Sequence, residues 1–111
     1  MDMVIRLYGQ IDGWPTKDRL ASLLASAGFS VAIGRYSIRL NDCEHFVFQE
    51  YGGDLGEPRI DADASSLEKM LADAGRVSCA LASADIRHRF ELCDIREELV
   101  GYLHHQWPKE T

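Results

Sequence analysis

The residues with the clearest chemical character are the carboxylates of one segment near the middle of the chain. Residues 50–63 contain five acidic side chains and one arginine, so about four of the six net negative charges lie in this segment. Carboxylates on a glycine-containing loop form a focused negative potential that attracts and orients a basic partner. We therefore predict a partner-binding surface with Tyr51 as an aromatic anchor. Its acidic residues are Glu50, Asp54, Glu57, Asp61 and Asp63.

The same segment lacks the pattern of a metal site. Asp61 and Asp63 are not followed by the glycine and terminal glutamate of an EF-hand loop. The chain contains no H-E-x-x-H or paired C-x-x-C spacing, and no G-x-S-x-G, P-loop or G-x-G-x-x-G motif. The sequence therefore predicts no metal and no cofactor. It favours a non-catalytic binding role without excluding an enzyme.

Length and composition restrict the remaining classes. The chain of 111 residues has the size of a single domain spanning 1–111, with 46% hydrophobic residues. A net charge of −6 disfavours nucleic acid and anionic membranes as partners. The three cysteines are an odd number, and no signal peptide or membrane span is evident. We expect free thiols and a cytoplasmic location.

Two short stretches resemble signatures of known families. Gly52-Gly53-Asp54 is similar to the start of the G-G-D-E-F signature of diguanylate cyclases, but Leu55-Gly56 replaces its last two residues. The stretch 43–48 resembles the aromatic strand of RNA-recognition motifs, but it has Glu44 and lacks the basic residue and glycine of that signature. These departures favour a turn and a core strand over nucleotide or RNA binding.

Hydrophobic periodicity predicts the elements of the first half. Residues 3–8 alternate as a strand, and 17–27 follow the helical i, i+3, i+4, i+7 pattern. Residues 29–40 read as one strand whose phase changes near Gly34, which indicates a bulge. Residues 45–51 form the strand of an antiparallel hairpin with it, and the acidic residues after Glu50 are expected in a loop.

The second half begins with a capping box at residues 65–68, followed by one long helix through Ala84. Residues 86–93 alternate as a strand, whereas 97–105 fit a strand or a helix. The predicted fold class is α+β, a ferredoxin-like two-layer sandwich of order βαββαβ plus a C-terminal strand or helix. Its antiparallel sheet would carry two helices on one face.

Strand alternation also gives an alternative function. The residues that point away from the predicted helices include four arginines, which could bind a small anion or nucleotide on an open sheet face. These candidate anion-binding residues are Arg6, Arg39, Arg87 and Arg89. A homodimer that closes the same face is a third possibility. The main hypothesis remains a small acidic protein-binding module, of which an immunity or antitoxin-type protein that neutralises a basic toxin domain is one example.

Overall fold

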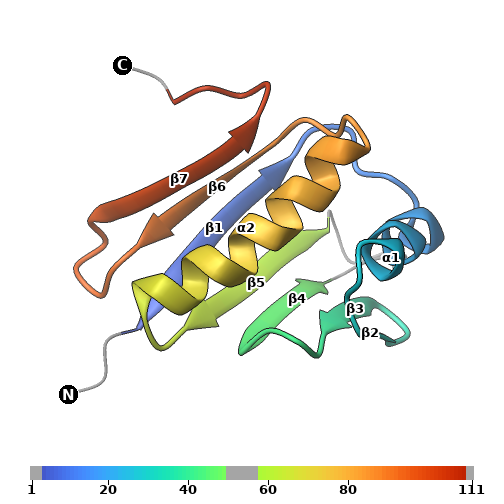
Figure 1. Ribbon diagram of the computed structural model, residues 1–111, viewed down its shortest axis with the longest axis horizontal. Helices are drawn as coiled ribbons and strands as arrows, with labels where there is room; N and C mark the ends of the chain where they lie inside the picture. The colour runs from blue at the N-terminus through green and yellow to red at the C-terminus, as the bar shows by residue number, and fades with distance from the viewer. Residues whose placement is uncertain (1–3, 50–57, 110–111) are drawn as a thin grey trace.

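The computed structural model describes residues 4–49 and 58–109 (Figure 1). The strands of this part of the chain form one sheet in the order β2-β3-β4-β5-β1-β6-β7, and all neighbours are antiparallel. The elements are, in chain order, β1 (Ile5–Ile11), α1 (Lys17–Ser26), β2 (Val31–Ile33), β3 (Ser37–Leu40), β4 (His45–Gln49), β5 (Arg59–Ala64), α2 (Leu67–Ser83), β6 (His88–Cys93) and β7 (Leu99–His105).

The strand β1 comes first in the chain and lies inside the sheet. It pairs with β5 on one side and with β6 on the other, so β5 and β6 run parallel to each other. α2 connects these two strands and crosses over β1 on the way (Figure 1). The strands from β2 to β5 form an antiparallel meander, which α1 joins to β1.

The ferredoxin-like βαββαβ prediction is wrong, because the described residues form a seven-stranded antiparallel sheet of a different order. One reason lies in residues 29–40. The phase change at Gly34 is a turn rather than a bulge, and Val31 on β2 pairs with Leu40 on β3. The amide N–H of Gly34 donates a hydrogen bond to the carbonyl oxygen of Ser37 across this turn (2.9 Å). One predicted strand is therefore two.

The other reason is β5, which lies in the stretch predicted as an acidic loop. Its residues alternate between the two faces of the sheet, and Ala62 and Ala64 are buried while Asp61 is exposed. This is the period-two pattern of a half-buried strand. Alanine and aspartate are depleted in strands, so composition argues for a loop where alternation argues for a strand. The alternation is the better guide here.

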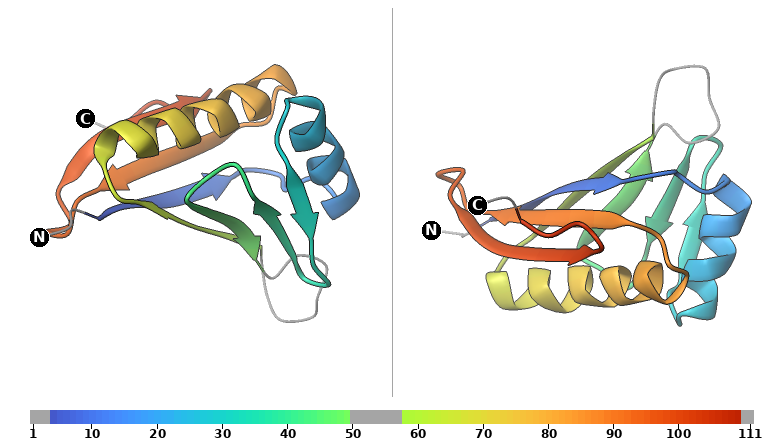
Figure 2. Two further views of the ribbon diagram at one scale, coloured as in Figure 1. Left: turned by 60° about the horizontal axis from the view of Figure 1, so that its bottom comes forward. Right: turned by 90° about the horizontal axis from the view of Figure 1, so that it is seen from above.

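One hydrophobic core fills the space between the helices and the inner face of the sheet. Phe46, Phe48 and Phe90 are buried on that face, and their rings contact one another. α1 contributes Leu20 and Leu24, which are fully buried. Figure 2 shows the sheet strongly curved, with α2 on one side of it.

Both helices begin at side-chain caps. The Thr16 hydroxyl accepts a hydrogen bond from the amide of Arg19 (3.2 Å), and α1 follows directly. For α2 the cap is Ser66, whose hydroxyl accepts from the amide of Lys69 (3.0 Å), one residue later than the predicted capping box. α2 continues through Gly75, which confirms the prediction of one long helix. Neither helix of the described residues has the length and apolar character that crossing a membrane requires.

Residues 97–105, for which strand and helix were alternatives, contain the edge strand β7. It follows a tight turn in which the Asp94 carboxylate accepts hydrogen bonds from the amides of Arg96 (2.8 Å) and Glu98 (3.0 Å). Between them, Glu97 adopts a φ of 62°. This left-handed conformation lets the chain reverse so that β7 pairs with β6.

Candidate functional site: the outer face of the sheet

The side of the sheet opposite the core carries the polar side chains. Residues directly opposite each other on paired strands share a face, so the register identifies them. Both helices lie on the other side, with the core (Figure 2). The outward residues include Ala32 on β2; Arg39 on β3; His45, Val47 and Gln49 on β4; Arg59, Asp61 and Asp63 on β5; Arg6, Tyr8 and Gln10 on β1; Arg89, Glu91 and Cys93 on β6; and Tyr102 and His104 on β7. Of these, Val47 and Cys93 are apolar and buried.

Of the predicted partner-binding residues, the structure places Asp61 and Asp63, both on β5. The Asp61 side chain is 55% exposed, and its carboxylate lies 3.4 Å from Nε2 of His45. Gln49 also donates a hydrogen bond to it (3.4 Å). Asp63 is opposite Arg6 on one side and His45 on the other. The remaining predicted residues lie outside the described part of the chain: Glu50, Tyr51, Asp54 and Glu57.

A cleft opens on this face where β1 and β5 separate. The two strands pair from Ile5 to Leu7 of β1. Beyond Leu7, β1 stays paired with β6 along its other edge, while the described part of β5 separates from it. On the inner side Ile60 fills the gap, so closely that a Cβ added at Gly9 would lie 2.7 Å from its Cδ1. The cleft has a volume of about 320 Å³ and is lined by Arg6, Leu7, Tyr8, Ile60, Asp61, Ala62 and Asp63.

Tyr8 forms one wall of this cleft and is held in place by its hydroxyl. The phenol donates to the Glu97 carboxylate, with distances of 3.0 and 3.2 Å to the two oxygens. This hydrogen bond raises the pKa of the Tyr8 phenol, because the neutral donor is favoured beside a carboxylate. The side chain is nevertheless 46% exposed. The Tyr8 ring is thus oriented by Glu97 and is also accessible to solvent.

Negative charge predominates around Tyr8. Glu91 lies directly opposite it on β6, and Glu97 binds its hydroxyl. Asp61 and Asp63 line the same cleft, where Arg6 supplies the one guanidinium. Glu91 and Glu97 were not among the predicted site residues. Strand alternation places Glu91 outward, but Glu97 is 89 positions from Tyr8, and no local pattern indicates that contact.

The four predicted anion-binding arginines do not converge on one point. Arg6 lies on β1 and Arg39 on β3, and β3 is four strand positions from β6, or about 19 Å at the usual strand spacing. Arg87 and Arg89 lie close together, but the chain itself occupies them. Arg87 donates to Asp12 (3.2 Å) and to the carbonyl oxygen of Gln106 (3.0 Å). Arg89 donates to the side-chain oxygen of Gln10.

These two arginines hold the segment after β7 against the outer face. The guanidinium carbons of Arg87 and Arg89 lie 4.0 and 4.7 Å from the ring centre of Trp107. The Tyr102 hydroxyl donates to the backbone carbonyl of Trp107 (2.6 Å). We name this arrangement the Trp107 clasp. Sequence alone did not indicate it, because the segment after β7 shows no periodicity that would place it on the sheet.

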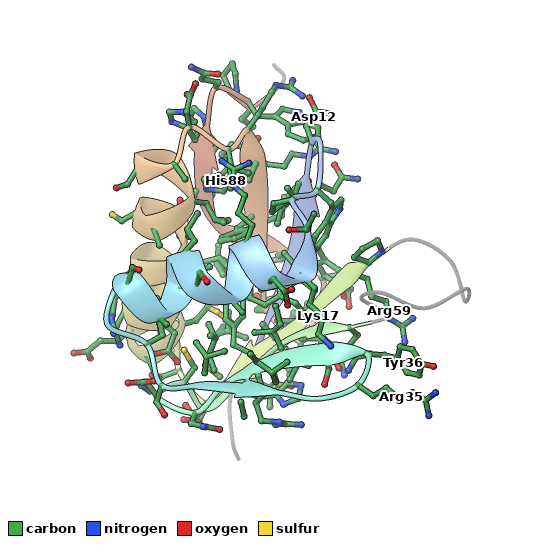
Figure 3. The ribbon with its side chains drawn as sticks, turned by 90° about the vertical axis from the view of Figure 1, so that its right-hand side faces the viewer. Asp12, Lys17, Arg35, Tyr36, Arg59 and His88 are labelled. Carbon is green, nitrogen blue, oxygen red and sulfur yellow. The ribbon has the colours of Figure 1, made fainter. Side chains whose placement is uncertain are left out.

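A second exposed tyrosine, Tyr36, lies in the turn between β2 and β3. The guanidinium of Arg35 lies 5.3 Å from its ring centre. The Lys17 ammonium, at the start of α1, donates to the carbonyl oxygens of Gly34 and of Arg35 (2.8 Å for the latter). Figure 3 shows Lys17 extending toward this turn. Tyr36 is 40% exposed, so it matches Tyr8 in exposure but has a cation against its ring.

The inner face holds one buried polar pair, which belongs to the core. His88 is fully buried beneath α2 (Figure 3), and its Nδ1 lies 2.8 Å from the carbonyl oxygen of Ile86. That contact requires a proton on Nδ1, so Nε2 accepts from the Ser78 hydroxyl at 2.7 Å. Burial lowers the pKa of the imidazole. His88 is therefore a core histidine with a hydrogen-bond partner at each ring nitrogen.

The thiols and carboxylates elsewhere do not form a reactive centre among the described residues. Cys43, Cys79 and Cys93 are free. Burial, with a contribution from nearby Asp73, raises the pKa of the Cys43 thiol to about 11, so it is protonated at neutral pH. Burial also raises the pKa of Cys93. No group of three or more histidine, cysteine or acidic side chains in residues 4–49 and 58–109 is placed to hold a metal ion.

Comparison with known proteins adds no family. No protein-family model matches the sequence, and neither the curated proteins nor the solved structures contain a match.

Proposed function

We propose that the protein binds a basic protein partner on the outer face of its sheet, around β5 and the acidic segment that leads into it. The observation that supports this proposal is the position of Asp61 and Asp63. Both lie on the face opposite the helices, beside the accessible ring of Tyr8. Exposed carboxylates next to an oriented aromatic side chain are typical of a surface that recognises cations.

The negative net charge of the chain supports a positively charged partner. Residues 50–63 contribute five negative charges and one positive charge to a chain whose net charge is −6. Such a field accelerates association with a basic surface and repels nucleic acid. A protein that neutralises a basic toxin domain is one example of this class, and it is the example we propose.

Neutralising the two described carboxylates tests the proposal. The variant Asp61→Asn with Asp63→Asn changes the net charge from −6 to −4, because two negative charges are removed. A control, Asp18→Asn with Glu68→Gln, makes the same change at the starts of the two helices. Basic proteins retained by immobilised wild type are identified from cell extract, purified, and measured against both variants by surface plasmon resonance.

The expected result is slower association and about fivefold weaker binding for the β5 variant, with the control within twofold of wild type. Equal losses in both variants would reduce the effect to overall charge and contradict a site on β5. Retention of acidic or neutral proteins, with no basic protein among them, would contradict the stated partner class.

A second copy of the chain is the other occupant that could cover this face. Sedimentation equilibrium at micromolar concentration distinguishes the two. The proposal expects a species of 12.5 kDa. A dimer that dissociates in the β5 variant would show that the face binds another copy of the same chain.

A further inference from the structure

Tyr8 differs from the other aromatic side chains in the described residues in having an open ring face. Trp14 contacts Phe48, Phe46 contacts Phe90, and Tyr102 contacts His104. Phe29, Tyr36 and Trp107 each have an arginine guanidinium over the ring. Within residues 4–49 and 58–109, no ring contact or cation–π contact to Tyr8 is present. Tyr8 is 46% exposed, and the described cation nearest to it in charge interaction, Arg6, acts on its hydroxyl rather than over its ring.

The Tyr8 ring is also positioned by a hydrogen bond at its far end. Its hydroxyl is bound by both oxygens of Glu97, which lies in the turn that the Asp94 carboxylate stabilises. A tyrosine has two side-chain torsions, and a hydrogen bond at the hydroxyl restricts both. An aromatic group that is ordered before binding loses little conformational entropy when a partner side chain packs on it.

The charges around the ring favour a cation over an anion. Asp61 and Asp63 lie on the β5 side of the cleft, and Glu91 and Glu97 lie on the β6 side. Against these four carboxylates stand the guanidinium groups of Arg6, in the cleft, and of Arg59, two residues from Asp61 on the same face of β5. The electron-rich ring face adds to the same preference. A phosphate or carboxylate group would meet net repulsion here.

The size of the cleft is compatible with one long side chain. A volume of about 320 Å³ is at the lower end of the range for small-molecule pockets. The cleft therefore has room for the end of one long side chain. Among cationic side chains, arginine is planar, stacks on aromatic faces and binds carboxylates through two parallel hydrogen bonds.

We infer that the cleft between β1 and β5 receives an arginine side chain of the partner, stacked on Tyr8 and hydrogen-bonded by Asp61 and Asp63. This inference rests on the proposed basic partner and adds the residue type that the cleft accepts. The Trp107 clasp shows the same contact within the molecule, with guanidinium groups at 4.0 and 4.7 Å from an aromatic ring centre.

The experiment is a titration followed by amide chemical shifts in the NMR spectrum. The probe is an acetylated and amidated peptide of alternating glycine and arginine, and the control peptide has citrulline in place of arginine. Citrulline keeps the shape of arginine and removes the charge. The expected result is saturable shift changes at Tyr8, Asp61 and Asp63 with the arginine peptide, and none with the citrulline peptide.

Two variants of Tyr8 separate stacking from general attraction. Tyr8→Ala removes the ring and is expected to weaken binding about fivefold, within the range known for cation–π contacts. Tyr8→Phe keeps the ring and loses the hydrogen bond to Glu97, so it should bind more weakly than wild type but more tightly than Tyr8→Ala; it also covers the case in which the alanine variant folds poorly. Tyr36→Ala is the matched control, since that ring is similarly exposed and already covered by Arg35, and it should leave binding unchanged.

The outcomes distinguish this inference from the proposed function. If the peptide binds the outer face and loses affinity in the Asp61→Asn, Asp63→Asn variant but not in Tyr8→Ala, the arginine cleft is wrong and the acidic surface stands. If the arginine and citrulline peptides bind equally, or the shifts map to the helices, the cleft is wrong too. In that case the binding of the purified basic partner to the β5 variant still tests the proposed function independently.

Discussion

Two aromatic residues on the same face of the sheet, Tyr8 and Trp107, have opposite surroundings. Trp107 is covered by the guanidinium groups of Arg87 and Arg89, which the chain supplies itself. Tyr8 is anchored by Glu97, and its ring face is open among the described residues. Near β6 and β7, the arginines of the outer face already contact an aromatic ring of the same chain. Near β1 and β5, the ring of Tyr8 and the carboxylates of Asp61 and Asp63 are available to a cation of a partner.

The largest expected effect concerns the side that the chain has completed itself. Trp107→Ala removes the ring beneath two arginines and leaves their guanidinium groups with fewer contacts. We expect a loss of about 2 kcal/mol in the free energy of unfolding, because each exposed cation–π contact contributes about 0.5–1 kcal/mol and the half-buried ring adds packing. Urea denaturation measures it. An unchanged midpoint would show that the clasp contributes nothing to folding.

Acid should weaken the same half of the sheet through His88. Its folded-state pKa is lowered by burial, so between that value and the ordinary 6.5 the unfolded state binds more protons than the folded state. Stability is therefore full above pH 6.5 and falls as the pH decreases below it, by up to about 1.4 kcal/mol per pH unit. Urea titrations from pH 7 to pH 5 check this. His88→Asn should flatten the dependence, and an equally steep slope in that variant would assign it to other groups.

Tyr8→Ala should have a smaller effect on stability than Trp107→Ala. The side chain is exposed, and its removal leaves Glu97 in contact with water. Surface substitutions of this kind change stability little, so we expect a shift in the urea midpoint below about a third of that for Trp107→Ala. Equal shifts would mean that Tyr8 is a structural residue, and the contrast between the two rings would be lost.

The smallest expected effect concerns the anchor of Tyr8. The hydrogen bond to Glu97 raises the pKa of the phenol, so Glu97→Gln should lower it toward its ordinary value of 10.0. Ultraviolet absorbance of tyrosinate measures the ionisation, and subtraction of the curve for Tyr8→Phe isolates this residue from the other tyrosines. A phenol pKa unchanged by Glu97→Gln would contradict the anchoring contact.

The sequence predicted the local elements better than their assembly. Thr16 marks the start of α1, and the alternation of Arg6 and Tyr8 with Ile5 and Leu7 identifies the outer face. These signals work because capping and strand alternation depend on neighbouring residues. The pairing of β1 with both β5 and β6 depends on residues more than fifty positions away, and no local pattern specifies it.

The candidate site was predictable only in part for the same reason. Asp61 and Asp63 stand out in the sequence by their charge, although not as members of a strand. The cleft, by contrast, exists because β1 and β5 separate after Leu7, and Glu97 reaches Tyr8 from the far end of β6. A sequence pattern cannot show a convergence of three elements that lie far apart in the chain.

The central place of β1 has a consequence for the order of folding. Its two neighbours, β5 and β6, both follow β2, β3 and β4 in the chain, and in the described sheet they are joined side by side only through β1. Each pairing closes a loop of more than fifty residues, which slows the search for the native state. The completion of the sheet around β1 therefore depends on two distant pairings, and loss of this strand would separate β2–β5 from β6 and β7 in the described sheet.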